Sequence, residues 1–171
     1  MKKNNTISKE EFAVHGYNVT EEQAQELNLH YHYPKNRWAL KKYNARGIGR
    51  NANNHGQVDM YLLINDNEII ENIGYEFNGC AIISFSASVF TEDMKGLMIE
   101  KAHRLVQNAL HQMISQDDCE RCTLMILEAF LGAYENYHNR KKSPSEEFSL
   151  RLINLENAVP QVCGKKREVV Y

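Results

Sequence analysis

The chain has 171 residues with 20 basic and 22 acidic side chains, a net charge of −2 and a hydrophobic fraction of 43%. These values describe one soluble globular domain, and the slightly acidic balance argues against nucleic-acid binding, which normally needs a basic surface. No apolar run approaches the roughly 18 residues of a membrane span and no secretory signal develops, so we expect a cytoplasmic protein without nucleic-acid or membrane partners.

The first predicted element is a short amphipathic helix over residues 20–31. Thr20 followed by Gln23 fits a capping box, and Pro34 ends the helix. Residues 44–56, NARGIGRNANNHG, are rich in Gly and Asn and predict a loop or a short edge strand. The GIG within them lacks the third glycine and the following helix of a dinucleotide-binding fingerprint.

Two strands are predicted next, over about residues 58–64 and 69–77, because apolar and polar residues alternate there. The turn Asn65-Asp66-Asn67 joins them into a hairpin, which the chain leaves at Asn78-Gly79-Cys80. Helical spacing begins at Ala81, and further helices are expected at about 97–114, from near Cys122 to about His138, and at 146–155 after a linker.

These elements predict an α+β fold, with a small antiparallel β-sheet and helices packed on one face. We expect the sequence to divide into an N-terminal extension over 1–19, a single domain over 20–140 and a C-terminal extension over 141–171.

Four cysteines, at positions 80, 119, 122 and 163, indicate a reducing compartment and favour metal or thiol chemistry over structural disulfides. Cys80 and Cys122 are each predicted at the start of a helix, where the positive end of the helix dipole lowers a thiol pKa. Cys119 and Cys122 also form a C-x-x-C pair, a spacing that zinc sites and redox pairs use. An isolated Cys163 is typical of a small apolar residue.

Several segments together resemble one family. They are INDNEIIENIGYEFNGCAIISFSASVFTE at 64–92, HYHYPKNR at 30–37, Lys95-Gly96, and Arg121-Cys122-Thr123-Leu124. Over residues 28–138 the chain resembles the iron–sulfur cluster assembly scaffolds of the NifU N-terminal, IscU and SufU type. The resemblance implies their fold and a transient iron–sulfur cluster or iron ion held through Cys80 and Cys122. It also implies sulfur supply by a cysteine desulfurase, delivery to recipient apo-proteins, and no enzymatic turnover of its own.

The chain departs from the family at the first cysteine. The family has Cys-Gly-Asp before the first hairpin strand, and Asn54-His55-Gly56 stands there, with no cysteine before residue 80. The remaining ligands would therefore come from His55, Asp59 and Cys119. Two alternatives stay open. One is a degenerate paralogue that binds zinc, or acts as an interaction or regulatory protein without cluster assembly. The other is a thiol-based sulfur transferase.

Overall fold

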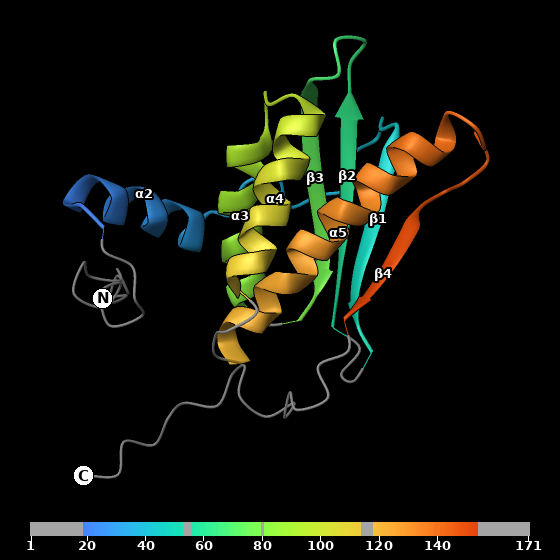
Figure 1. Cartoon of the computed structure of the whole chain (residues 1–171). Coiled ribbons are helices and arrows are strands. Elements are labelled where there is room, and N and C mark those ends of the chain that lie inside the picture. Colours follow the sequence, from blue (N-terminus) through green and yellow to red (C-terminus); the bar gives the residue numbers. More distant parts are fainter. Residues whose placement is uncertain (1–18, 53–55, 80, 114–117, 154–171) are drawn as a thin grey trace.

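A computed structural model describes residues 19–52, 56–79, 81–113 and 118–153, together with the side chains of all these residues except 113 and 118–122. It contains four helices and four strands in these ranges (Figure 1). In chain order they are α2 (Glu21–His32), β1 (Ala45–Asn51), β2 (Gln57–Ile64), β3 (Ile70–Asn78), α3 (Ala81–Met94), α4 (Ile99–Met113), α5 (Asp118–Arg140) and β4 (Ser149–Ile153). No helix in the described ranges is long and apolar enough to cross a membrane.

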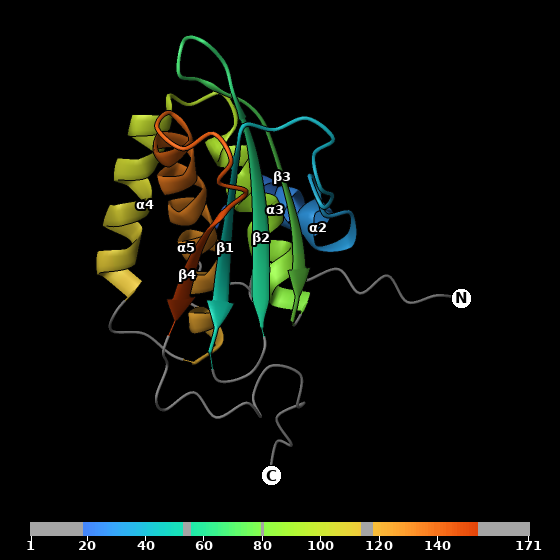
Figure 2. The ribbon, with the colours of Figure 1, turned by 90° about the vertical axis from the view of Figure 1, so that its right-hand side faces the viewer.

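The strands form one sheet in the order β3-β2-β1-β4, and the helices form a layer on one of its faces (Figures 1 and 2). β2 pairs antiparallel with β1 and with β3, whereas β4 pairs parallel with β1. Helices α3 and α5 contact the strands, α4 packs against α5, and α2 packs against α3. The predicted α+β fold is confirmed, with a mixed sheet because β4 is parallel to its neighbour.

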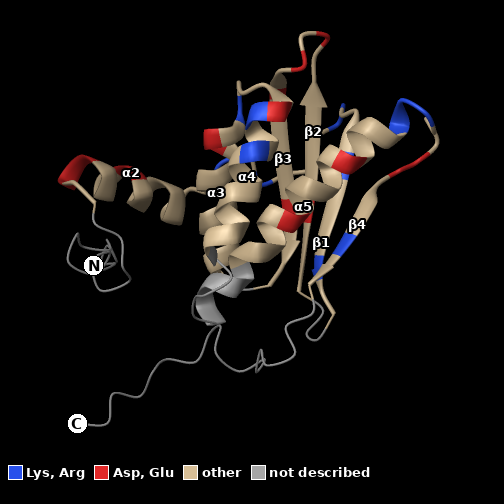
Figure 3. Cartoon of the chain, viewed as in Figure 1, with Lys and Arg blue, Asp and Glu red and all other residues tan. Residues whose placement is uncertain are grey.

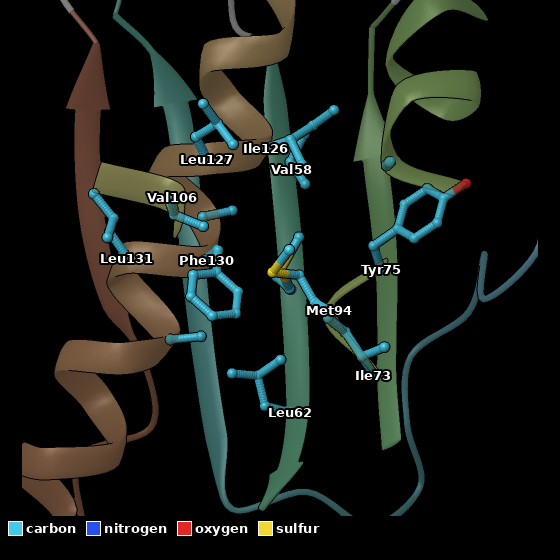
Figure 4. Close-up of a cluster of buried hydrophobic side chains, with 14 of the residues drawn as sticks. Val58, Leu62, Ile73, Tyr75, Met94, Val106, Ile126, Leu127, Phe130 and Leu131 are labelled. Carbon is cyan, nitrogen blue, oxygen red and sulfur yellow. The ribbon is translucent and has the colours of Figure 1, made fainter. Parts of the chain in front are cut away.

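The core lies between the sheet and the helix layer (Figure 4). Alternate residues of β2 and β3 point into it, and the fully buried ones include Val58, Leu62 and Tyr75. From the helices, Phe130 of α5 stacks edge-on against Phe90 of α3, with ring centroids 5.6 Å apart. Burial of this kind contributes about 1.5–3 kcal/mol for each large apolar side chain.

Helix α5 and strand β1 touch at the level of their backbones. A β-carbon added to Gly47 would lie 2.0 Å from both Ala129 O and Ala133 N, and one added to Gly49 would lie 2.1 Å from Met125 O. Gly132 meets the strand from the helix side, since its β-carbon would lie 3.2 Å from Gly47 Cα. The GIG segment therefore serves close helix–strand packing.

Two predicted elements were wrong. The segment predicted as a loop or edge strand contains β1, which is an inner strand between β2 and β4. Glycine has a low strand propensity, but here the close approach of α5 requires it. The segment predicted as a helix at 146–155 contains strand β4, where Leu150 and Leu152 alternate with Arg151 and Ile153 at the period of a strand. The hairpin and the helices at α2, α3, α4 and α5 are confirmed within a few residues.

Replacing Gly47 with alanine tests the contact between α5 and β1. The new methyl group would overlap helix backbone atoms that cannot rotate away, so we expect Gly47→Ala to lower the free energy of unfolding by about 3 kcal/mol or more. Urea unfolding followed by circular dichroism measures the change. Gly96→Ala is the control, because Gly96 has a φ of +85° and nothing within 4 Å of an added β-carbon. That variant should lose about 1–2 kcal/mol through backbone strain alone. Equal losses in the two variants would contradict the close-packing role.

Candidate functional site

Helix α2 is fixed against α3 by a buried histidine. Thr20 and Gln23 form the expected capping box at its start, with Thr20 Oγ1 accepting from Gln23 N at 3.2 Å. Near its end, His30 is 4% exposed, and its Nδ1 lies 2.7 Å from Ser88 Oγ on α3. The same hydroxyl oxygen accepts from the backbone N–H of Lys35 at 2.7 Å. One serine thus ties both the helix and the chain that leaves it to α3.

The next residues extend this attachment to the sheet. Asn36 Nδ2 donates to Thr91 Oγ1 at 3.0 Å and to Glu92 Oε1 at 2.8 Å. The carbonyl oxygen of Asn36 accepts from Tyr75 N at 2.9 Å, at the free edge of β3. The HYHYPKNR segment that resembles the family is therefore a polar clamp, formed by His30, Lys35 and Asn36 with Ser88, Thr91 and Glu92. It holds α2, α3 and β3 in fixed relation.

Two side chains of the clamp, His30 and Glu92, have shifted pKa values. Desolvation lowers the pKa of His30, helped by the nearby charge of Lys35, so the imidazole is held neutral. Hydrogen bonding from Asn36, then from Lys35, lowers the pKa of Glu92 and keeps it charged. Desolvation raises the pKa of the neighbouring Asp93. The clamp is thus built around one neutral imidazole and one stabilised carboxylate.

Described residues next to His55 and Cys80 lie together at one end of the sheet. Cys80 and His55 lie outside the described residues, but the residues that flank them are described. Gln57, two residues after His55, is the register partner of Asn78, two residues before Cys80. Across the loop that contains His55, Asn51 N donates to Gly56 O at 2.8 Å. The described residues that flank His55 and Cys80 are therefore neighbours at the end where β1 and β3 finish (Figures 1 and 2).

Helix α5 begins at the same end. It starts at Asp118, earlier than predicted, so that Cys119 and Cys122 both belong to its first turns. Their side chains lie outside the described residues. Met125, three residues after Cys122, is where α5 meets Gly49 of β1, two residues before β1 finishes. The start of α5 is thus placed near the ends of β1 and β3, and α3 begins there directly after β3 (Figure 1).

Asp59, in contrast, is described fully. It alternates with the buried Val58 and Met60 and so lies on the sheet face away from the helices. Its Oδ2 accepts from Arg46 Nη2 at 2.6 Å, and its Oδ1 accepts from Gln57 Nε2. Arg46 also lies over the rings of Tyr61 and Phe148, at 5.2 and 5.3 Å from their centroids. Both carboxylate oxygens of Asp59 are therefore engaged in a network on that face.

An apolar groove lies between α2, the middle and end of α3, and the first half of α5. It has a volume of about 320 Å³, and its lining includes Leu27 of α2, Phe85 and Val89 of α3, and Thr123 and Ile126 of α5. Thr123 directly follows Cys122 in the chain.

Among the described side chains, no group of three or more His, Cys, Asp and Glu residues could hold a metal ion. Of the five residues predicted to bind metal, only Asp59 has a described side chain. Sequence reasoning did not identify Ser88, Thr91 and Glu92 as partners of the HYHYPKNR segment. Their spacing on one helix face was visible, but small polar residues on a helix do not reveal which segment they will meet.

Comparison with known proteins adds an independent finding. A family model described as the NifU-like N terminal domain matches residues 22–144, more than half of the chain. The fold is similar to the N-terminal part of a nitrogen-fixing NifU-like protein from Brucella abortus. The TM-score is 0.55 and the identity 14%, covering 64% of this chain and 90% of that one.

A second similar structure is a putative iron-sulfur cluster assembly scaffold protein for the SUF system from Fervidobacterium islandicum AW-1. Its TM-score is 0.46 and its identity 22%, covering 74% of this chain and 83% of that one. No curated protein sequence matches the chain.

Removing the hydroxyl group of Ser88 tests the clamp. Ser88→Ala would leave the N–H of Lys35 and the imidazole of His30 without their shared partner, so we expect a loss of about 1–3 kcal/mol in the free energy of unfolding. Ser86→Ala on the same helix is the control, and it should change stability by less than about 0.5 kcal/mol. Chemical denaturation measures both variants. A Ser88→Ala protein as stable as the control would show that these hydrogen bonds do not hold α2 in place.

Proposed function

This chain belongs to the family of NifU-like N-terminal domains, and we propose that it is a scaffold that carries an iron–sulfur cluster, or iron, as transient cargo. The observation that carries the proposal is the meeting of three chain segments at one end of the sheet. These are the residues flanking His55, the residues flanking Cys80, and the first turns of α5 with Cys119 and Cys122.

Cys80 and Cys122 are the first two proposed ligands. Thiolates are the form of cysteine that binds iron and zinc, and a helix start favours the thiolate through its unpaired N–H groups and its positive dipole end. Helix α3 has 14 residues and α5 has 23, so both are long enough to have a developed dipole. Cys80 directly precedes α3 and Cys119 is the second residue of α5, so these two positions favour the thiolate, whereas Cys122 is the fifth residue of α5, past the first turn where the dipole acts.

Cys119 is the strongest candidate for the third ligand. Because α5 starts at Asp118, positions 119 and 122 are three residues apart on a helix and share one face. A thiolate there would stand in for the cysteine that the family has before its first hairpin strand. His55 is the alternative, since imidazole also binds iron and zinc. Asp59 would first have to give up Arg46 and Gln57, and so ranks last.

The proposal includes the partners and the setting that this role requires. Sulfur would arrive as persulfide from a cysteine desulfurase, and the finished cluster would leave to recipient apo-proteins. The chain would be a carrier without enzymatic turnover of its own, in the cytoplasm, where thiols stay reduced.

A second function is favoured by one observation, the absence of any cysteine before residue 80. With fewer thiolates the same site would hold a zinc ion stably, and the chain would act as an interaction or regulatory protein without cluster assembly. If Cys119 and Cys122 instead cycled as a redox pair, the chain would be a thiol-based sulfur transferase. Metal content after reconstitution distinguishes the three functions.

Substituting the two proposed ligands tests the site. After anaerobic reconstitution with iron, sulfide and a cysteine desulfurase, we expect Cys80→Ser and Cys122→Ser each to lower retained iron by more than roughly tenfold, because serine is a poor ligand for soft metals. Iron and sulfide analysis with visible absorption spectra measures the retention. Cys163→Ser is the matched control and should retain as much iron as the unchanged protein. Full retention in Cys80→Ser would exclude the proposed site.

A second set of variants identifies the third ligand. We expect Cys119→Ser to weaken iron binding by roughly tenfold in competition with a chelator, and His55→Ala to have a smaller effect. His55→Cys should tighten binding, because it restores a thiolate at the family's position. A strong loss in His55→Ala with none in Cys119→Ser would assign the third position to histidine. If the unchanged protein holds zinc and no cluster after reconstitution, the second function replaces the first.

A further inference from the structure

Strand β4 lies at one edge of the sheet and beyond the residues that match the family. Among the described residues it pairs with β1 alone, in the sheet order β3-β2-β1-β4, so alternate peptide groups of β4 face away from these strands. At the opposite edge, Asn36 O already accepts from Tyr75 N of β3. The family match ends at residue 144, before β4 begins at Ser149. The outer edge of β4 is therefore a feature of this chain that its family membership does not explain.

An apolar stripe runs along this edge on the face away from the helices. Leu150 and Leu152 pair in register with Ile48 and Arg50, whose neighbours Gly47 and Gly49 face α5. Phe148, Leu150 and Leu152 are 38%, 42% and 61% exposed. Edge strands normally carry a lysine, a proline or an outward charge that prevents pairing with another strand. The only charged residue of β4 is Arg151, and Figure 3 shows blue but no red along this strand. The Arg151 side chain lies on the helix side, where it binds Glu128 and Glu135 of α5.

The chain itself supplies a segment with the matching pattern. Residues 167–171, REVVY, follow β4 after a connection that contains Pro160 and Gly164, residues typical of loops. In an extended segment Val169 and Tyr171 share one side with Arg167 and alternate with Glu168 and Val170, and valine and tyrosine have high strand propensity. The connection, residues 154–166, is longer than the roughly two to five residues of a typical hairpin loop, so it can span the return to β4. We propose that residues 167–171 pair antiparallel with the outer edge of β4 and cover Leu150 and Leu152 with Val169 and Tyr171.

Charge and concentration favour this segment over a second copy of the chain. If β4 paired antiparallel with β4 of another copy about its centre, the two Arg151 residues would stand opposite each other, and like charges directly opposite are destabilising. In the register that pairs Val169 with Leu152 and Tyr171 with Leu150, the uncharged Val170 stands opposite Arg151 instead. A segment on the same chain also has an effective concentration in the millimolar range, far above that of a second copy in dilute solution.

Hydrogen–deuterium exchange of the full chain tests the proposal. We expect the amides of 148–153 to exchange at least roughly tenfold faster when the chain is ended after Lys166 or when Val169 and Tyr171 are both changed to Asp. The control is the double change Lys165→Ser and Lys166→Ser, which alters the connection alone and should leave exchange unchanged. A peptide of residues 164–171 added to the shortened chain should restore the protection, and the same peptide with both aspartates should not.

Two results would overturn the proposal. The first is unchanged exchange in β4 after the truncation, which would mean that residues 167–171 do not cover this edge. The second is a full-length dimer, seen by light scattering, that Leu152→Glu dissociates into monomers. That result would assign the edge to a second copy of the chain.

Discussion

The backbone contact between α5 and β1 is the constraint on which the rest of the structure depends. Gly47 and Gly49 present no side chains to the helix, and Gly132 presents none to the strand, so the two backbones meet directly. A helix held this close cannot slide along the strand without colliding with it, because protein interiors are close-packed. The contact therefore fixes where α5 begins relative to the ends of β1 and β3, and α5 carries two of the proposed ligands.

The polar clamp fixes the position of α3 relative to α2 and β3. Ser88, Thr91 and Glu92 lie on α3 and engage His30, Lys35 and Asn36, while Asn36 also bonds to the edge of β3. Buried polar groups are costly when unpaired, so a fully bonded cluster allows one arrangement and penalises others. The start of α3 is consequently set from two sides, by its direct exit from β3 and by the clamp. The HYHYPKNR segment thus has a structural role, because it holds α3 in place.

The two faces of the sheet have different chemistry. The helix side is apolar and closed over the core, whereas the opposite face carries the network of Arg46, Gln57, Asp59 and Tyr61. A buried carboxylate is stable only when paired, and Arg46 provides that pairing for Asp59. A helix start favours a thiolate only modestly, by about 0.3–1 kcal/mol. Asp59 already has its partner in Arg46, and the proposed cargo site therefore relies on cysteines rather than on this aspartate.

The sequence by itself determined the elements whose signals are local. The capping box at Thr20, the turn at Asn65, the period change after Cys80 and the family resemblance all follow from neighbouring residues, and the structure and the family match confirm them. Only the tertiary structure decided that the glycine-rich segment is an inner strand, because its reason is a helix some 80 residues later in the chain. It also decided that Ser149–Ile153 is a strand, since five residues gain strand order only from a neighbour such as β1. Spacing in sequence does not report distance in space, so only the packing of α5 on β1 shows that the first turns of α5 lie near the end of β1.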